Sequence, residues 1–386
     1  MTQQLTVSSP TVLLLAFHSY AGMGPYVVSI VNSFKPCDNI RFFLIEGPDR
    51  YYHDNIRPDL LDKGLIKTDT HVNKFRTLIE TIWRERSPYR KEIIKYCNEE
   101  GISIIHDLTG CTDNGLIKSL DRHFTLLFTV HDLFPHEVKK SFFKEWRIKS
   151  IYKRLFKSIR SSSSLITNSL EQMTLQKEKY PEKNHFYAKF PTLITPNIAG
   201  GRESVPELKG EKGYILFFGR IEAYKGVENL IDAFISANLP QDVKLVIAGK
   251  GELGYSQSDS RIVTINRYID DKEIAALYRN AAVVVYPYLS ATQSGVLSVS
   301  TFFRTPTIAS DVTFFKEILG DDYTLLFKAG DCKALSHILE NLFSLNHQQL
   351  SAIKTLMHHI YETVYSDTAQ RERLLEIYST LEKNNP

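Results

Sequence analysis

Two cations lie where a strand is expected to end and a helix to begin. An apolar run at residues 214–218 is followed by Gly219 and Arg220, then by Lys225 and Gly226, and then by a helical pattern. Open α/β sheets bind ligands at the carboxyl ends of their strands, and a helix N-terminus adds partial positive charge. Arg offers a bidentate fork to phosphate oxygens, and Lys offers a mobile point charge. The spacing therefore predicts a diphosphate site at Gly219, Arg220 and Lys225; a pair of solvated surface cations is the alternative.

A second candidate loop is polar but uncharged. Residues 291–296 read Ala-Thr-Gln-Ser-Gly-Val and precede another helical pattern. Backbone N–H groups and hydroxyls before a helix can hold phosphates and a sugar without a side-chain charge. We expect ligand contacts from Thr292, Gln293, Ser294, Gly295 and Val296, with Gly295 allowing close approach. The alternative is a polar helix cap with Ser294 as the N-cap residue.

The first half of the chain offers strand-end candidates as well. One apolar run ends at His131, and the first apolar run is followed by a turn that contains Gly22 and Gly24. We expect these three residues to line the binding site. The alternatives are a structural histidine and glycines that only form the turn. The pair His106 and Asp107, at the end of another run, is a further candidate.

Short apolar runs alternate with helical patterns along the whole chain. In the first half the runs cover residues 12–17, 40–45, 102–106, 125–131 and 164–168, and helical periodicity covers 73–98, 139–160 and 170–179. In the second half the runs cover 214–219, 244–249, 261–266, 283–286, 307–310 and 324–327. Such runs between helices indicate parallel strands that are covered on both faces. The predicted fold class is therefore α/β.

A turn-rich segment around residues 196–210 separates the two series and indicates a linker. The length of 386 residues also favours two domains. We place these domains at residues 1–198 and 199–365. A helix at residues 366–386 then packs on the second domain or returns to the first.

The composition is that of an average globular protein, with 43% hydrophobic and 24% charged residues. A net charge of +3 argues against a dedicated nucleic-acid binder. The four cysteines form no Cys-x-x-Cys pair, so the sequence predicts neither a metal site nor a disulfide framework. The apolar run at residues 12–17 is too short for a signal or a membrane span, and we expect a cytoplasmic protein.

Residues 214–343 resemble the nucleotide-sugar-binding half of the family 4 glycosyltransferases, the glycosyl transferases group 1. The family's Gly-Arg…Lys-Gly signature is similar to residues 213–226, its strand ending in Gly-x-Gly to 247–251, and its Thr-Pro-Val-Ile-Ala-Ser strand to 305–310. Members are retaining enzymes with the GT-B fold. The resemblance therefore implies two Rossmann-like domains that face each other across a cleft.

The resemblance also implies roles for the candidate residues. Arg220 and Lys225 would neutralise the donor diphosphate, His131 would approach the donor sugar, and the loop with Gly22 and Gly24 would lie near the phosphates and the acceptor. No metal or other cofactor is implied, because the nucleoside diphosphate sugar is a co-substrate.

One departure from the family concerns two carboxylates. Many members carry two glutamates in the second loop and its helix, at positions that correspond to Ala291 and Val299. The chain lacks both and resembles a variant of the family with an Ala-Thr-Gln-Ser-Gly-Val loop. The contacts to the sugar and the ribose therefore stay open.

The expected activity is transfer of a hexose-type sugar from a nucleoside diphosphate sugar to a hydroxyl acceptor, with retention of configuration. The resemblance favours a saccharide or lipid-linked acceptor, in surface polysaccharide or glycolipid biosynthesis. One alternative is a catalytically degenerate sugar-nucleotide-binding partner subunit, which the missing glutamates favour. Another is a dinucleotide-dependent oxidoreductase, whose motif would need a third glycine at Val27 and an acidic residue closing the second strand.

The segment 139–160 is strongly basic. Its only acid is Glu145, and its cations are Lys139, Lys140, Lys144, Arg147, Lys149, Lys153, Arg154, Lys157 and Arg160. Apolar residues interleave as in an amphipathic helix. We expect this helix to dock the protein on an anionic membrane surface, at the inner face of the membrane. The alternative is that its apolar face packs on the sheet of the first domain.

Overall fold

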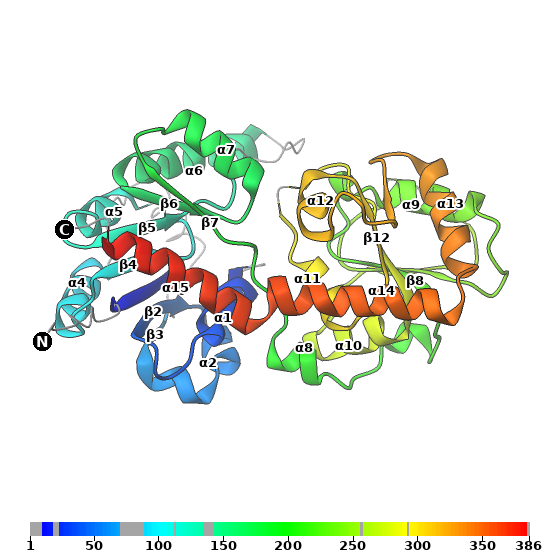
Figure 1. Ribbon diagram of the computed structural model, residues 1–386, viewed down its shortest axis with the longest axis horizontal. Coiled ribbons are helices and arrows are strands. Elements are labelled where there is room, and N and C mark those ends of the chain that lie inside the picture. The colour runs from blue at the N-terminus through cyan, green and yellow to red at the C-terminus, as the bar shows by residue number, and fades with distance from the viewer. Residues whose placement is uncertain are drawn as a thin grey trace, which may run out of the picture. The chain divides into compact units, whose positions relative to one another are not determined.

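The computed structural model describes residues 10–17, 23–69, 89–111, 113–133, 142–254, 258–291 and 293–383, with only the backbone for 142–147. Contacts divide the chain into two units. Unit 1 contains Met1–Lys189 and Asp367–Pro386, and unit 2 contains Phe190–Ser366. Each unit holds one parallel sheet with helices (Figure 1).

Unit 1 is built on a seven-stranded sheet in the order β3-β2-β1-β4-β5-β6-β7. The strands are β1 (Val12–Phe17), β2 (Ile40–Glu46), β3 (Gly64–Thr68), β4 (Ile104–Asp107), β5 (Thr125–Thr129), β6 (Ser164–Thr167) and β7 (Asn184–Tyr187). The described helices are α1 (Met23–Ser33), α2 (Tyr51–Asn55), η1 (Pro58–Lys63), α4 (Arg90–Glu99), α5 (Asn114–Leu120), α6 (Phe142–Ser161), α7 (Leu170–Lys179) and α15 (Asp367–Lys383).

The sheet of unit 1 extends beyond the strands predicted from the sequence. The central strand β1 is an apolar run with five of its six residues buried, and such strands were predicted correctly. The outermost strands β3 and β7 were not predicted. Their residues are mostly half-buried, because an edge strand has a neighbour on one side only and needs no continuous apolar run. The predicted helix at 73–98 lies partly outside the described residues, and its described part is α4.

The C-terminal helix α15 belongs to unit 1, where it packs beside α1 (Figure 1). Arg371 Nε lies 2.7 Å from Asp38 Oδ2. The hydroxyl of Tyr378, which is fully buried, lies 2.8 Å from Nδ1 of His106 at the end of β4. The helix therefore completes the packing of unit 1 although it follows all of unit 2 in the sequence.

Unit 2 is built on a six-stranded parallel sheet in the order β10-β9-β8-β11-β12-β13. The strands are β8 (Tyr214–Phe218), β9 (Leu245–Ala248), β10 (Ile262–Ile265), β11 (Ala281–Tyr286), β12 (Thr307–Ser310) and β13 (Leu326–Phe327). The described helices are α8 (Pro196–Gly200), η2 (Pro206–Leu208), η3 (Ala223–Lys225), α9 (Val227–Ser236), α10 (Asp271–Asn280), α11 (Val296–Phe302), α12 (Thr313–Leu319), α13 (Cys332–Phe343), α14 (His347–Ile360) and η4 (Tyr361–Tyr365).

The turn-rich segment at 196–210 is part of unit 2, whereas the sequence indicated a linker. Ile198, Val205 and Leu208 are buried in the hydrophobic core of this unit. The boundary therefore lies after Lys189, earlier than the expected position after residue 198, and a second boundary lies between Ser366 and Asp367. These three buried residues are separated by turns and show neither helical nor strand periodicity. The sequence pattern therefore could not reveal their packing.

Two Rossmann-like α/β domains are thus confirmed, and the order of strands locates the ligand site in each. The chain order reverses between β1 and β4 in unit 1 and between β8 and β11 in unit 2. In doubly wound sheets the ligand binds outside the carboxyl ends of the strands at this reversal. The loops after β8 and β11 contain the two candidate segments of unit 2.

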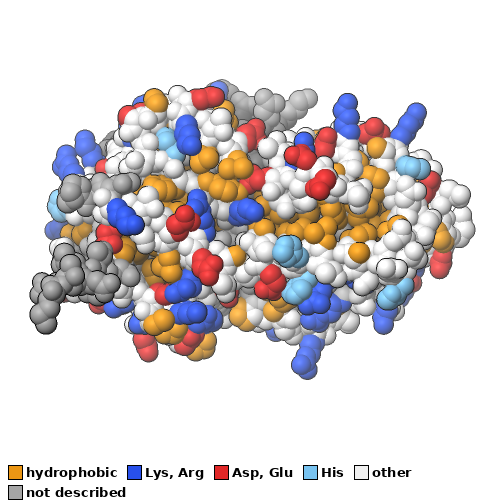
Figure 2. Space-filling view, viewed as in Figure 1, with side chains coloured by type: hydrophobic (Ala, Val, Ile, Leu, Met, Phe, Trp, Pro, Cys, Tyr) orange, Lys and Arg blue, Asp and Glu red, His pale blue; other side chains and the backbone are white. Residues whose placement is uncertain are grey.

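The surface visible in Figure 2 is mixed in charge. Lys and Arg alternate with Asp and Glu across this face, and hydrophobic side chains gather over unit 2 between α12 and α14. None of the described helices has the length and apolar character needed to cross a bilayer.

Candidate functional site

The loop after β8 places Lys225 against Gly219. Gly219 has φ 138° and donates its N–H to the carbonyl of Ala248 at 3.0 Å, which fixes the loop to the end of β9. A Cβ at this position would lie only 3.0 Å from Nζ of Lys225. Because glycine has no side chain, the ammonium group of Lys225 can lie next to position 219.

Lys225 is only 8% exposed. Its Nζ lies 5.2 Å from the centroid of the Tyr288 ring and 5.9 Å from that of Tyr224. In the part of the chain that the structure describes, no acid pairs with this ammonium. A buried cation without an acid is unfavourable, and attraction to aromatic faces offsets only about 1–2 kcal/mol of the cost. The position is therefore suited to an anionic ligand.

Arg220 is placed differently. Its side chain is 70% exposed, and its Nη1 lies 3.4 Å from Oε1 of Glu222. An exposed ion pair of this kind contributes little to stability. Arg220 can therefore turn toward an anionic ligand at little cost. Both cations follow the end of β8: Lys225 is held in place by its surroundings, whereas Arg220 is free to change its side-chain conformation.

The loops after β8 and β11 are packed together. The N–H of Leu289 donates to the carbonyl of Tyr224 at 2.8 Å. Gly226 has φ 62°, and a Cβ on it would lie 2.1 Å from the carbonyl oxygen of Pro287. The motif at 219–226 thus contacts residues 287–289, which lead from β11 into the loop 291–296.

Tyr288 joins the cation to the polar loop, and sequence reasoning missed it. Its carbonyl accepts from Ser310 Oγ at 2.6 Å, and its hydroxyl lies 3.4 Å from Ser294 Oγ. The side-chain oxygen Oε1 of Gln293 is buried and has no hydrogen-bond partner in the described part of the chain. Thr292 lies outside the described residues. Tyr288 therefore lies against Lys225 through its ring and close to Ser294 through its hydroxyl.

The residues at the start of α11 have partly structural roles. Gly295 is the N-cap residue, and Ser294 makes no capping hydrogen bond. A Cβ on Gly295 would lie 2.4 Å from Cδ1 of Leu193, so packing favours glycine here whether or not a ligand approaches it. The carbonyl of Val296 accepts from the Tyr286 hydroxyl at 2.9 Å.

The two positions where relatives carry glutamates have no carboxylate. Val299 is 1% exposed and belongs to the hydrophobic core of unit 2, and Ala291 packs against the same core. Neither position can therefore offer a carboxylate to a sugar.

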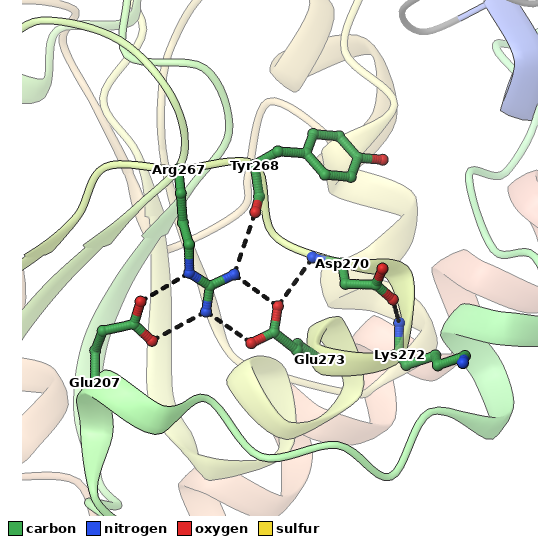
Figure 3. A network of polar contacts seen from close by, with 6 residues as sticks. All are labelled: Glu207, Arg267, Tyr268, Asp270, Lys272 and Glu273. Atoms are coloured by element: carbon green, nitrogen blue, oxygen red, sulfur yellow. Dashed lines mark hydrogen bonds and ion pairs between the residues drawn. The ribbon is translucent and has the colours of Figure 1, made fainter.

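A charged cluster fixes the turn after β10 (Figure 3). Arg267 donates to Glu207 from Nε at 2.7 Å and from Nη2 at 3.0 Å, and to Glu273 from Nη1 and Nη2 at 2.7 Å each. Hydrogen bonds from Arg267 lower the pKa values of both carboxyls. The neighbouring Tyr268 is 74% exposed. The sequence signal for this cluster is the capping box of Asp270 and Glu273 at the start of α10.

In unit 1, His131 follows β5 and is half-buried. Its Nε2 lies 2.8 Å from the carbonyl oxygen of Leu108, and its ring packs edge-on against Tyr26 at 4.9 Å. Burial lowers the pKa of His131. A neutral ring that donates from Nε2 keeps Nδ1 as a hydrogen-bond acceptor.

Of the two candidate glycines in the first loop, Gly22 and Gly24, the structure describes one. Gly24 is the buried second residue of α1 rather than part of a turn before it. Gly22 lies outside the described residues. Gly24 and His131 belong to unit 1, as do the further candidates His106 and Asp107, and the described candidates of the two loops at 219–226 and 291–296 belong to unit 2.

The further candidates His106 and Asp107 are packed inside unit 1. His106 is 1% exposed, with Nδ1 beside the Tyr378 hydroxyl and Nε2 3.1 Å from Thr129 Oγ1. Asp107 accepts from the N–H of Cys111 at 2.6 Å. Burial lowers the pKa of His106 to about 3 and raises that of Asp107 to about 6. These contacts indicate a structural pair.

We expect His106→Gln to be less stable than the wild type at pH 8, and we expect this difference in the free energy of unfolding to shrink in acid. The pKa of His106 is about 3 in the folded protein against 6.5 ordinarily, so the unfolded chain takes up the proton first as pH falls. The stability due to the neutral ring is present above pH 6.5 and is lost progressively toward pH 3, by about 2 kcal/mol at pH 5. Urea unfolding at pH 8 and pH 5 measures this, and an equal deficit at both would contradict it.

Unit 1 also shows why the oxidoreductase alternative fits poorly. The second strand does end in an acid, Glu46, which is 1% exposed. Its carboxylate accepts from the N–H groups of Tyr52 at 2.8 Å and His53 at 3.2 Å and contacts His53 Nδ1 at 2.5 Å. This carboxylate caps α2 and is not presented to a ribose.

Comparison with known proteins relates part of the second unit to a family and the whole chain to a fold. Residues 212–344 match the family model for glycosyl transferases group 1. No curated protein matches the sequence. Sucrose-phosphate synthase from Thermosynechococcus elongatus is 15% identical, over 97% of this chain and 100% of that chain, with a TM-score of 0.65.

Two further solved structures are similar. HepE from Anabaena in complex with UDP is 14% identical, over 96% of this chain and 100% of that chain, with a TM-score of 0.64. The lipopolysaccharide outer core galactosyltransferase WaaB is 14% identical, over 96% and 99%, with a TM-score of 0.57. These likenesses concern the fold. Residues 212–344 thus match the glycosyl transferases group 1, and the likenesses to solved structures show that the chain has the GT-B fold.

Proposed function

We propose that the protein transfers a hexose from a nucleoside diphosphate sugar to a hydroxyl acceptor with retention of configuration. The observation that carries this proposal is the ammonium of Lys225, which is nearly buried on two tyrosine rings and meets no acid among the described residues. A diphosphate supplies the missing negative charge. That HepE was solved with UDP supports a nucleotide donor.

The chemistry proposed for this site is electrostatic. Negative charge grows on the leaving nucleoside diphosphate as the glycosidic bond breaks, and Lys225 is already in place to balance it. Arg220 adds a second cation that can turn toward the phosphates. Departure of the leaving group would assist deprotonation of the acceptor on the same face, and His131 would line the sugar. No metal is required in this scheme, since the cations supply the charge.

The acceptor we propose is a saccharide or a lipid-linked saccharide in surface polysaccharide or glycolipid biosynthesis. The structural likeness to WaaB, a lipopolysaccharide galactosyltransferase, supports this class of acceptor. The rival function is a catalytically inactive partner subunit that binds sugar nucleotides. The absence of a carboxylate at Ala291 and Val299 favours the rival, whereas the preorganised Lys225 favours the enzyme.

Thermal unfolding with a panel of nucleoside diphosphate sugars tests the proposed donor. We expect one of them to stabilise the protein by about 2.7 kcal/mol at a hundredfold excess over its dissociation constant. The enzyme would also hydrolyse that donor slowly without an acceptor. No response to any member would refute donor binding, and a thermal response without hydrolysis or transfer would favour the inactive partner subunit.

We also propose that α6 docks the protein on an anionic membrane surface. Ile159 is fully buried, and Leu155 packs against the core of unit 1, so this part of the apolar side faces the sheet. The exposed side carries a row of cations at helical spacing: Lys149, Lys153, Lys157 and Arg160. Each cation near an anionic leaflet contributes about 1 kcal/mol. The docking would therefore be electrostatic and reversible, without insertion of these apolar side chains.

Sedimentation with liposomes tests this docking. We expect binding to anionic vesicles that weakens as salt is raised and disappears when Lys149, Lys153, Lys157 and Arg160 are changed to Glu. The matched control reverses the same number of exposed cations elsewhere in unit 1: Lys91, Lys95, Lys118 and Arg122. Equal loss in both variants, or equal binding to neutral vesicles, would exclude α6 as the docking surface.

A further inference from the structure

Gln293 has a buried acceptor without a partner. Its Oε1 is shielded from solvent and makes no hydrogen bond with any of the residues that the structure describes. An amide oxygen buried in this way is unfavourable unless a ligand supplies a donor. Gln293 lies directly before Ser294, whose Oγ is 3.4 Å from the Tyr288 hydroxyl. The oxygen without a partner is therefore in the loop that contacts Tyr288, the tyrosine whose ring lies against Lys225.

An amide oxygen can pair only with those parts of a nucleoside diphosphate sugar that donate a hydrogen bond. An ionised diphosphate carries acceptors only, so it can pair with Lys225 but offers nothing to an amide oxygen. Hydroxyls of the transferred sugar and of the ribose are donors, and only those of the transferred sugar are absent from the nucleoside diphosphate. The loop also offers no carboxylate to such a hydroxyl, because Val299 is in the core and Ala291 has only a methyl group. Gln293 Oε1 is the polar atom of the described loop that lacks a donor.

We propose that Gln293 is a specificity-determining residue whose amide oxygen accepts a hydrogen bond from a hydroxyl of the transferred sugar. This rests on the proposed function of the site as a sugar-nucleotide site. The cations then hold the diphosphate, and a neutral amide holds the sugar in place of a carboxylate. A neutral acceptor leaves the charge of Lys225 wholly available to the phosphates, since no acid competes for it.

The test compares binding of each sugar nucleotide with binding of its own nucleoside diphosphate: UDP-glucose with UDP, and GDP-mannose with GDP. The variant Gln293→Met keeps the length of the side chain and removes the amide. We expect its dissociation constant for the preferred sugar nucleotide to rise about tenfold, as for loss of one hydrogen bond. Binding of the nucleoside diphosphate should change less than about twofold.

Two further variants serve as controls for this result. Gln176→Met is the matched control, since Gln176 in α7 of unit 1 is also buried and neither of its amide atoms has a partner among the described residues. It should leave both dissociation constants unchanged. Gln293→Glu keeps an acceptor, so the ratio of the two dissociation constants should stay near that of the wild type even though the added charge weakens both.

The outcomes separate this inference from the proposed function. If the wild type binds neither nucleoside diphosphates nor their sugars, the proposed function fails. If it binds both and Gln293→Met weakens both equally, or weakens neither, the role of Gln293 is refuted while the donor site stands. A loss of sugar preference in Gln293→Met, kept in Gln293→Glu and Gln176→Met, supports the inference.

Discussion

Lys225→Met should lower turnover about 30- to 1000-fold, equivalent to about 2–4 kcal/mol of transition-state stabilisation. The free protein should be no less stable than the wild type. Met fills a similar volume and makes favourable sulfur contacts with aromatic rings, and the variant no longer buries a cation without an acid. Function and stability should therefore move in opposite directions, which a residue that serves only packing would not show.

The measurement combines donor hydrolysis or transfer with thermal unfolding in the presence and absence of the nucleoside diphosphate. Lys212→Met is the control, because Lys212 is an exposed lysine just before β8. Arg220→Ala should also reduce turnover within the same range, with no loss of stability, since its ion pair with Glu222 is largely exposed. Near wild-type turnover in both Lys225→Met and Arg220→Ala would show that the diphosphate does not bind here.

Gly226→Ala should destabilise unit 2 by about 3–5 kcal/mol and abolish donor binding. Two effects add at this position. The backbone has φ 62°, which L-residues rarely adopt, and the added Cβ would lie 2.1 Å from the carbonyl oxygen of Pro287. Because a backbone atom cannot yield as a side chain does, the loops after β8 and β11 would have to separate.

Gly101→Ala separates the two effects. Gly101 has φ 60°, and a Cβ on it would have no heavy atom within 4 Å. It should cost only the conformational term, about 1–2 kcal/mol. Urea unfolding of each variant, with the transitions of the two units resolved, measures the difference. Similar costs for the two substitutions would mean that the approach of Gly226 to Pro287 is not needed for the fold.

The sequence by itself determined the central strands and one half of the site. Continuous apolar runs at β1 and β8 can only be buried on both faces of a sheet. Arg220 and Lys225 were found because their distance from a strand end is a local property of the chain. The prediction of two Rossmann-like domains is confirmed for the same reason. The site roles of these residues stay predictions.

The tertiary structure decided which groups meet. Tyr288 lies beneath Lys225, and Leu193 occupies the space that Gly295 leaves open. It also assigned residues 196–210 to unit 2 and α15 to unit 1. Each of these depends on contacts between segments far apart in the sequence. Periodicity reports only which side of an element is buried, and the partner on that side is set by how the strands are ordered and by the shape of the packed core.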